Sequence, residues 1–149
     1  MPRAIQKFEV SLKAFILRQG QALFVREADT GFWELPGGRI DMGEETEPHE
    51  AILARELAEE LGTGFRIEIG PDAVTWTRRR PLDGAFLFIV ARVCRHSAGE
   101  PQLSHEHDKY VWLAADASRG LHWPPQSAYP AGIAELFRRA APQRPGLNP

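Results

Sequence analysis

Three glutamates of one predicted helix are spaced so that their carboxylates share one strip of its surface. Glu56, Glu59 and Glu60 lie within two turns, and at about 100° per residue Glu56 is about 40° from Glu60 and about 60° from Glu59. Like charges at this spacing repel and weaken a helix. Grouped carboxylates suit Mg²⁺ or Mn²⁺, which also bind the phosphate oxygens of a substrate. The strip therefore predicts a site for Mg²⁺ or Mn²⁺.

A turn with two consecutive glycines precedes the acidic helix. The segment 33–38 (WELPGG) ends in Gly37 and Gly38, which allow the backbone to approach a ligand or metal closely. An acidic helix by itself is more often a solvated surface, here with Arg55 as a local ion-pair partner. The glycine turn beside it favours a binding site over that simpler interpretation.

The segment 35–62 resembles the signature of the Nudix hydrolases. That signature is a glycine, five residues, a glutamate, seven residues, and then Arg-Glu-aliphatic-any-Glu-Glu-any-Gly-aliphatic. Gly38 matches the glycine, Glu44 follows after five residues, and segment 55–62 (RELAEELG) matches the second half. A motif of this length seldom matches by chance.

Two departures from the signature concern spacing and the last residue. Ten residues instead of seven separate Glu44 from Arg55, and Thr63 replaces the final aliphatic residue. Glu47 restores the seven-residue spacing to Arg55, but then eight residues separate it from Gly38. The sequence leaves open whether Glu44 or Glu47 is the first glutamate of the motif.

The resemblance implies both a fold and an activity. The fold would be α+β, a Nudix-type α/β/α sandwich with a mixed β-sheet and a central catalytic loop–helix–loop. The activity would be divalent-metal-dependent hydrolysis of the pyrophosphate bond of a nucleoside diphosphate linked to another moiety. A non-catalytic Nudix-like module that binds a nucleotide is the alternative, but such modules usually lack one or more of the motif glutamates, which are all present here. A structural domain with a charged helix would leave the whole motif as coincidence.

Carried over by position, the resemblance gives roles to particular residues. Mg²⁺ or Mn²⁺ would be held by Glu56, Glu59 and Glu60, with the backbone carbonyl of Gly37 or Gly38 completing the ligand set. Arg55 would orient a carboxylate, as a planar guanidinium does well. The catalytic residues would be Arg55, Glu56, Glu59 and Glu106, with either Glu56 or Glu106 as general base.

Substrate contacts are the least specified part of the resemblance. Arg26, Trp33 and Glu44 occupy positions where similar proteins contact substrate, although Trp33 fits a core position equally well. Two histidines, His105 and His107, flank Glu106, but histidines beside acids in a loop are more often surface residues. The run 78–80 (RRR) is predicted to be a solvated turn rather than a phosphate contact.

Hydrophobic periodicity predicts the elements that position these residues. Strands are expected at 8–16, 22–25, 65–69, 73–77, 85–93 and 109–113, with a turn at 19–21 that makes the first two a hairpin. Helices are expected at 48–61 and from about 130 to 140, the first beginning with Pro48 and ending at Gly62. Residues 1–141 are predicted to form a single domain, followed by a flexible tail at 142–149.

Composition sets limits on partners and location. The chain has 149 residues, a net charge of −2 and one cysteine, which argues against a nucleic-acid polymer as partner and excludes an intrachain disulfide. Neither a signal peptide nor a membrane span is predicted, so a cytoplasmic protein is expected. Its partner would be a nucleotide or a nucleotide-derived small molecule, and the resemblance leaves a homodimer open.

Overall fold

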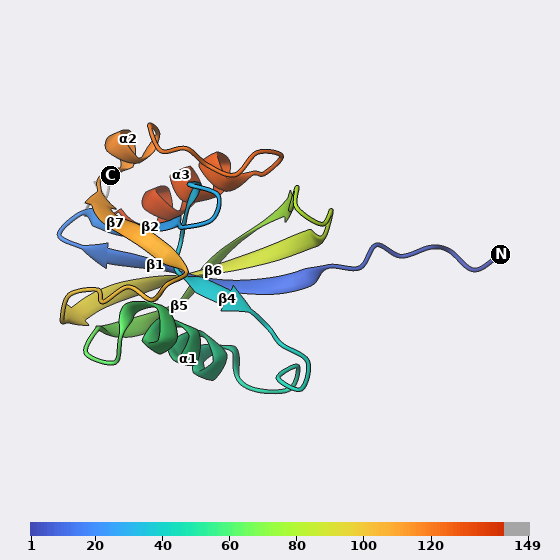
Figure 1. Ribbon diagram of the computed structural model, residues 1–149, viewed down its shortest axis with the longest axis horizontal. Coiled ribbons are helices and arrows are strands. Elements are labelled where there is room, and N and C mark those ends of the chain that lie inside the picture. The colour runs from blue at the N-terminus through green and yellow to red at the C-terminus, as the bar shows by residue number, and fades with distance from the viewer. Residues whose placement is uncertain (142–149) are drawn as a thin grey trace, which may run out of the picture.

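A mixed β-sheet lies between two helical layers in the computed structural model, which describes residues 1–141 (Figure 1). The predicted tail at 142–149 lies outside the described residues. The strands are β1 (Glu9–Arg18), β2 (Gln21–Glu27), β3 (Trp33–Glu34), β4 (Gly37–Arg39), β5 (Arg66–Arg79), β6 (Phe86–Ala98) and β7 (His107–Leu113). The helices are α1 (His49–Leu61), α2 (Ala115–Ser118) and α3 (Tyr129–Ala140). Figure 1 shows α1 on one side of the sheet and α2 and α3 on the other, which confirms the expected α/β/α sandwich.

The strands β1 and β2 form the predicted hairpin but pair only beside their turn. Leu17 lies opposite Ala22 and Arg18 opposite Gln21, while the first half of β1 pairs instead with β4. On its other side β1 runs parallel to β6, and β5 pairs antiparallel with β6. Strands β3 and β7 pair with β2. Because β1 and β2 diverge beyond the hairpin, the sheet opens between them.

The helix α1 covers one face of the sheet with an apolar strip. Ile52, Leu53, Leu57 and Leu61 are buried in a cluster that includes Leu12, Ala14 and Ile16 of β1. Burial of each such side chain contributes roughly 1.5–3 kcal/mol. The predicted ends are confirmed within one residue, since Pro48 is the N-cap and Gly62 ends the helix with a positive φ of 85°. Ala54 and Ala58 lie beside this strip and are exposed.

The opposite face of the sheet packs on α3. Phe15, Trp76, Ile89 and Tyr129 belong to this second core cluster. Strand β5 is continuous where two separate strands were predicted, with an irregularity between Ile69 and Ala73. The short elements β3, β4 and α2 were not predicted, because two to four residues carry no periodic signal.

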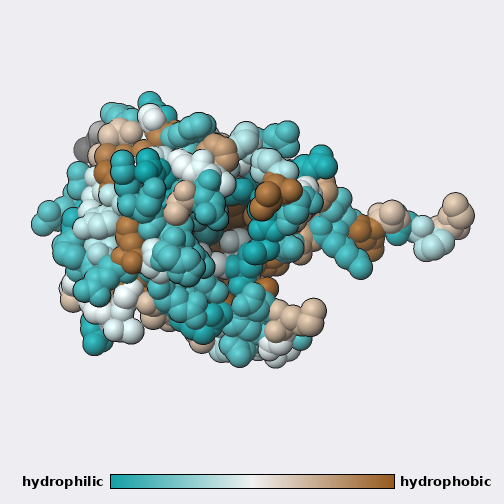
Figure 2. Space-filling model, viewed as in Figure 1, coloured by the Kyte–Doolittle hydropathy of each residue, from teal (hydrophilic) through white to brown (hydrophobic). Residues whose placement is uncertain are grey.

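The visible surface in Figure 2 is mostly hydrophilic, with a recess between its upper and lower halves. The first eight residues extend away from the body as an exposed arm (Figure 1). Within residues 1–141, none of the helices has the length and apolar content needed to cross a bilayer.

Candidate active site

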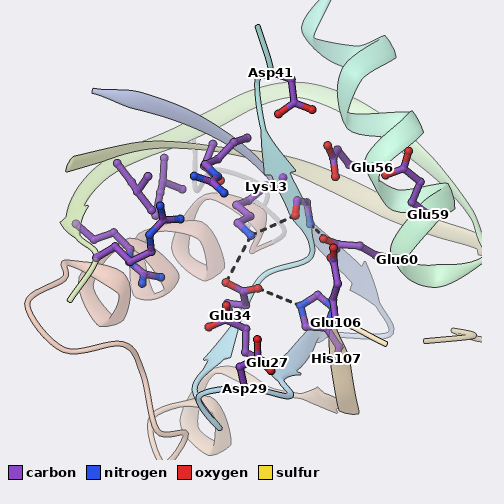
Figure 3. A pocket seen from close by; sticks show the side chains of 18 of the residues that line it. Lys13, Glu27, Asp29, Glu34, Asp41, Glu56, Glu59, Glu60, Glu106 and His107 are labelled. Atoms are coloured by element: carbon purple, nitrogen blue, oxygen red, sulfur yellow. Dashed lines mark hydrogen bonds and ion pairs between the residues drawn. The ribbon is translucent and has the colours of Figure 1, made fainter. Parts of the chain in front are cut away.

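A polar cavity of about 730 Å³ occupies the region where β1 and β2 diverge. Its walls come from α1, the glycine turn, β1, the end of β5 and the loop before β7. Eight carboxylate side chains line it: Glu27, Asp29, Glu34, Asp41, Glu56, Glu59, Glu60 and Glu106. Five cationic side chains line it as well: Lys13, Arg39, Arg55, Arg78 and Arg80. Figure 3 shows Glu56, Glu59 and Glu60 projecting from α1 along one side.

The glycine turn fits closely against two of the helix glutamates. The Gly37 amide donates a hydrogen bond to Glu60 Oε2 at 2.9 Å. A Cβ added to Gly38 would collide with the carboxylate of Glu56. Both carboxylates therefore lie beside the turn, and a side chain at Gly38 would fill the space between the backbone and Glu56. A donor set of hard carboxylate oxygens next to an open backbone fits Mg²⁺ or Mn²⁺.

The three helix glutamates differ in burial although they share one strip. Glu60 is only 4% exposed, and burial raises its pKa to about 7. Burial also raises the pKa of Glu56, whose side chain is 14% exposed. The side chain of Glu59 is 60% exposed and forms an ion pair with Arg55 at 3.1 Å. Glu56 and Glu60 thus form the inner part of the strip, and Glu59 forms its rim.

The loop before β7 brings a further carboxylate to Glu60. One ligand atom each of Glu60, Glu106 and His107 lies within 4.8 Å of the others, and Figure 3 shows Glu106 beside Glu60. Glu106 was predicted to join the site from outside the motif, and the fold brings it there. His107, for which a surface position was favoured, is instead 4% exposed.

A buried ion network holds the floor of the cavity. Glu34 Oε1 lies 3.0 Å from His107 Nε2, and Glu34 Oε2 lies 3.6 Å from Lys13 Nζ, which also donates to the Gly37 carbonyl at 3.3 Å. Burial acts to raise the pKa of Glu34, but Lys13 and His107 outweigh it and hold that pKa below its ordinary value. Burial also acts to lower the pKa of Lys13, but the nearby acidic groups, Glu34 first among them, together outweigh it, so that pKa is raised. Lys13 and Glu34 are therefore both charged at neutral pH.

The motif arginine connects the inserted loop to the helix glutamates. Arg55 donates to Glu44 Oε2 at 2.6 Å and to Glu59 Oε1 at 3.1 Å, and it lies 3.3 Å from Glu56 Oε1. The other oxygen of Glu44 accepts the Asp41 amide at 2.9 Å. By geometry Glu44 is thus the glutamate that meets Arg55, whereas Glu47 is exposed.

Replacing Glu44 by glutamine is expected to lower kcat/KM by about 10- to 100-fold, the usual loss when a residue that orients metal ligands is changed. The reason is that Arg55 would lose its charged partner and hold Glu56 and Glu59 less firmly. Steady-state hydrolysis with Glu47→Gln as the matched control measures the effect. Equal losses in the two variants would contradict the importance of the Glu44–Arg55 pair.

Three predicted substrate contacts are not among the residues that line the cavity. Arg26 forms a two-pronged pair with Asp108 at 2.8 Å per bond. Trp33 packs against the core cluster beneath α3. The side chain of Glu44 is bound to Arg55. The structure therefore gives no support to substrate binding by these three residues, because each is engaged by the fold itself.

Two cavity residues were missed because of how the strands present their polar faces. Lys13 alternates with apolar residues on β1, a pattern typical of a solvent-facing position, yet it is 7% exposed. Arg78 continues the buried alternation of Val74 and Trp76 on β5 and is 8% exposed. The alternation along β5 could have identified Arg78 as buried, but the run of three arginines favoured the prediction of a solvated turn.

The raised pKa of Glu60 predicts the pH dependence of stability in the metal-free protein. A carboxyl group with an ordinary pKa of 4.5 when unfolded and about 7 when folded binds its proton more firmly in the folded state. Its contribution to stability is full below pH 4.5 and is lost as pH rises to about 7. Glu60→Gln should remove this loss, roughly 3 kcal/mol of unfolding free energy. Urea unfolding at several pH values between 5 and 8 tests this, and an unchanged pH slope in the variant would contradict it.

Comparison with known proteins agrees with the geometry. The family model described as the NUDIX domain matches residues 7–131. The chain belongs to the NUDIX family, and the expected Nudix-type fold is thereby confirmed.

Named relatives and a solved structure extend this result. A "MutT-like protein" of Streptomyces ambofaciens is 37% identical over 110 residues, covering 72% of this chain and 64% of that protein. A Mycobacterium tuberculosis protein named "Putative 8-oxo-dGTP diphosphatase 2" is 36% identical over 115 residues, covering 72% of this chain and 70% of that protein. The crystal structure of a UDP-X diphosphatase shares the fold, with a TM-score of 0.70 and 19% identity over 92% of this chain and 64% of that one. The chain thus spans less than two thirds of the length of two of these proteins.

Proposed function

We propose that the protein hydrolyses the pyrophosphate bond of a nucleoside diphosphate linked to another moiety, with Mg²⁺ or Mn²⁺ as cofactor. The observation that carries the proposal is the meeting of Glu56, Glu60 and Glu106 beside the glycine turn in one polar cavity. A pyrophosphate is anionic and would be repelled by these carboxylates unless cations lay between them. The names of the relatives, which include a diphosphatase, support this activity.

In this proposal each site residue has a defined task. Glu56, Glu59, Glu60 and the carbonyl of Gly38 would hold the divalent cation, since the Gly37 carbonyl already accepts the Lys13 ammonium. The bound cation would neutralise the phosphate oxygens and acidify a water molecule. Arg55 would hold Glu56 and Glu59 in place through its contacts with both.

Two carboxylates are available to accept the proton of the attacking water. Glu56 has a pKa raised by burial, which suits a group that must take up a proton near neutral pH. Glu106 is exposed and lies beside Glu60. The base is the residue whose glutamine variant stays inactive even when Mn²⁺ is saturating, so Mn²⁺ titration combined with turnover at saturating Mn²⁺ in Glu56→Gln and Glu106→Gln distinguishes the two.

The activity itself is tested with a panel of nucleoside triphosphates, nucleotide sugars, ADP-ribose and dinucleoside polyphosphates. Phosphate-containing products should appear with Mg²⁺ or Mn²⁺ and disappear when EDTA removes the metal. Binding without cleavage of every compound would instead favour the non-catalytic nucleotide-binding module.

Three further expectations stay predictions from the sequence: a cytoplasmic location, a domain spanning residues 1–141, and the lack of a nucleic-acid polymer as partner. Whether the protein is a homodimer is also open. Size-exclusion chromatography with light scattering would determine its oligomeric state.

A further inference from the structure

Three consecutive arginines at the end of β5 have three different environments. Arg79 is exposed and lies over the ring of Phe86 at 5.5 Å. Arg80 is bound by the carboxylate of Asp83 in the turn that follows. Arg78 is buried and points to the cavity side of the strand. The expectation of a solvated turn is therefore wrong for Arg78.

Arg78 differs from the other cations of the cavity in having no carboxylate of the described residues within ion-pair distance. Lys13, Arg39, Arg55 and Arg80 are each paired with a carboxylate. Among residues 1–141, no hydrogen-bond or ion-pair partner is found for the Arg78 side chain, and its buried Nε is unsatisfied. A buried cation without a partner is costly, so this guanidinium is available for an anion that enters the cavity.

The surroundings of Arg78 favour a phosphate group over a nucleobase. The nearby carboxylate of Glu34 is already shared by Lys13 and His107. Within the described chain, Tyr129 is the one residue with a phenyl or indole ring that lines the cavity, and it is fully buried. The Arg78 wall thus offers fixed positive charge without an exposed aromatic face on which a base could stack.

Arg78 and the helix glutamates belong to opposite sides of the sheet. Arg78 follows Val74 and Trp76 on the face that packs against α3, whereas Glu56 and Glu60 come from α1 on the other face. Arg78 and the helix glutamates therefore enter the shared cavity from different walls, so one ligand can present different groups to each.

We propose that Arg78 is a specificity-determining residue that binds a phosphoryl group outside the metal-bound pyrophosphate. This proposal rests on the proposed function. It predicts that substrates with three or more linked phosphates, such as nucleoside triphosphates, are preferred over nucleotide sugars, which offer only two. A planar guanidinium matches phosphate oxygens with paired hydrogen bonds.

The test compares Arg78→Met with Arg79→Met on UTP and UDP-glucose, which share the same nucleoside. Arg78→Met should raise the KM for UTP by about 10- to 100-fold, the range for a lost charge-assisted hydrogen bond, and change the KM for UDP-glucose by less than about twofold. Arg79→Met should leave both values unchanged, and Arg78→Lys should restore part of the UTP effect. Equal losses on both substrates would overturn the proposal, because they would indicate contact with the nucleoside or a disturbed fold.

A second measurement keeps the test separate from turnover. Calorimetric titration of the protein in the presence of Mg²⁺ with inorganic tripolyphosphate should show binding that Arg78→Met weakens at least about 10-fold, relative to Arg79→Met. If no nucleotide is hydrolysed but this difference is observed, the proposed activity fails while the phosphate site stands. If tripolyphosphate binds both variants equally, the phosphate site is refuted even in an active enzyme.

Discussion

Replacing Glu60 by glutamine is expected to lower hydrolysis by about 10³-fold, because a lost metal ligand removes several kcal/mol of transition-state stabilisation. Glu60 is buried, accepts the Gly37 amide and lies beside Glu106. Glutamine has nearly the same shape and retains an oxygen for the Gly37 amide. The fold should therefore persist while the affinity for the cation falls.

Two measurements check this result together. Turnover of a nucleotide substrate is followed with Mg²⁺, and Mn²⁺ binding is followed by electron paramagnetic resonance. Glu47→Gln is the control, since Glu47 is exposed and does not line the cavity. Glu59→Gln is expected to impair turnover as well. If both Glu59→Gln and Glu60→Gln kept full activity, the assignment of the metal to this strip would be wrong.

Replacing Gly37 by alanine is expected to destabilise the protein by about 3 kcal/mol or more, from backbone strain combined with overpacking. Gly37 is buried and has a φ of 137°, which side-chain-bearing residues rarely adopt. An added Cβ would collide with the carbonyl oxygen of Leu12, which is backbone of β1 and cannot move aside alone. The substitution would therefore separate β4 from β1 and displace the turn against which Glu60 lies.

Gly43→Ala provides a matched control for this substitution. Gly43 also has a positive φ, of 97°, but no atom lies within 4 Å of the added Cβ. Gly43→Ala should lower the free energy of unfolding only by the cost of backbone strain, about 1 kcal/mol. Chemical denaturation of both variants gives the difference. Equal losses of unfolding free energy would show that close contact with β1 contributes nothing.

The long elements were predictable because their signals are local. Alternating apolar residues placed β1 and β7 within a few residues, and the helix bounded by Pro48 and Gly62 was placed to within one residue. The motif by itself also identified Glu56, Glu60 and Arg55 as candidate site residues. Each of these depends on neighbours in sequence rather than on the packing of distant segments.

The other half of the site could not be predicted, because it depends on which strand faces enclose a cavity. Alternation showed that Lys13 lies opposite the apolar face of β1, but not that this polar face is covered. Whether Glu44 or Glu47 pairs with Arg55 depends on how the inserted loop folds, which residue spacing does not determine. The pairing of Arg26 with Asp108 could not be predicted either, because Asp108 lies on another strand.

The hydroxyl of Tyr129 lies 3.3 Å from the Leu35 amide, although 94 residues separate the two. The helix α3 therefore holds the segment between β3 and the glycine turn in place. A polypeptide divided between α2 and α3 would lose this acceptor, and adding α3 as a separate fragment would return it. Such a division would make a two-fragment reporter, in which recovered hydrolysis signals that the fragments have met.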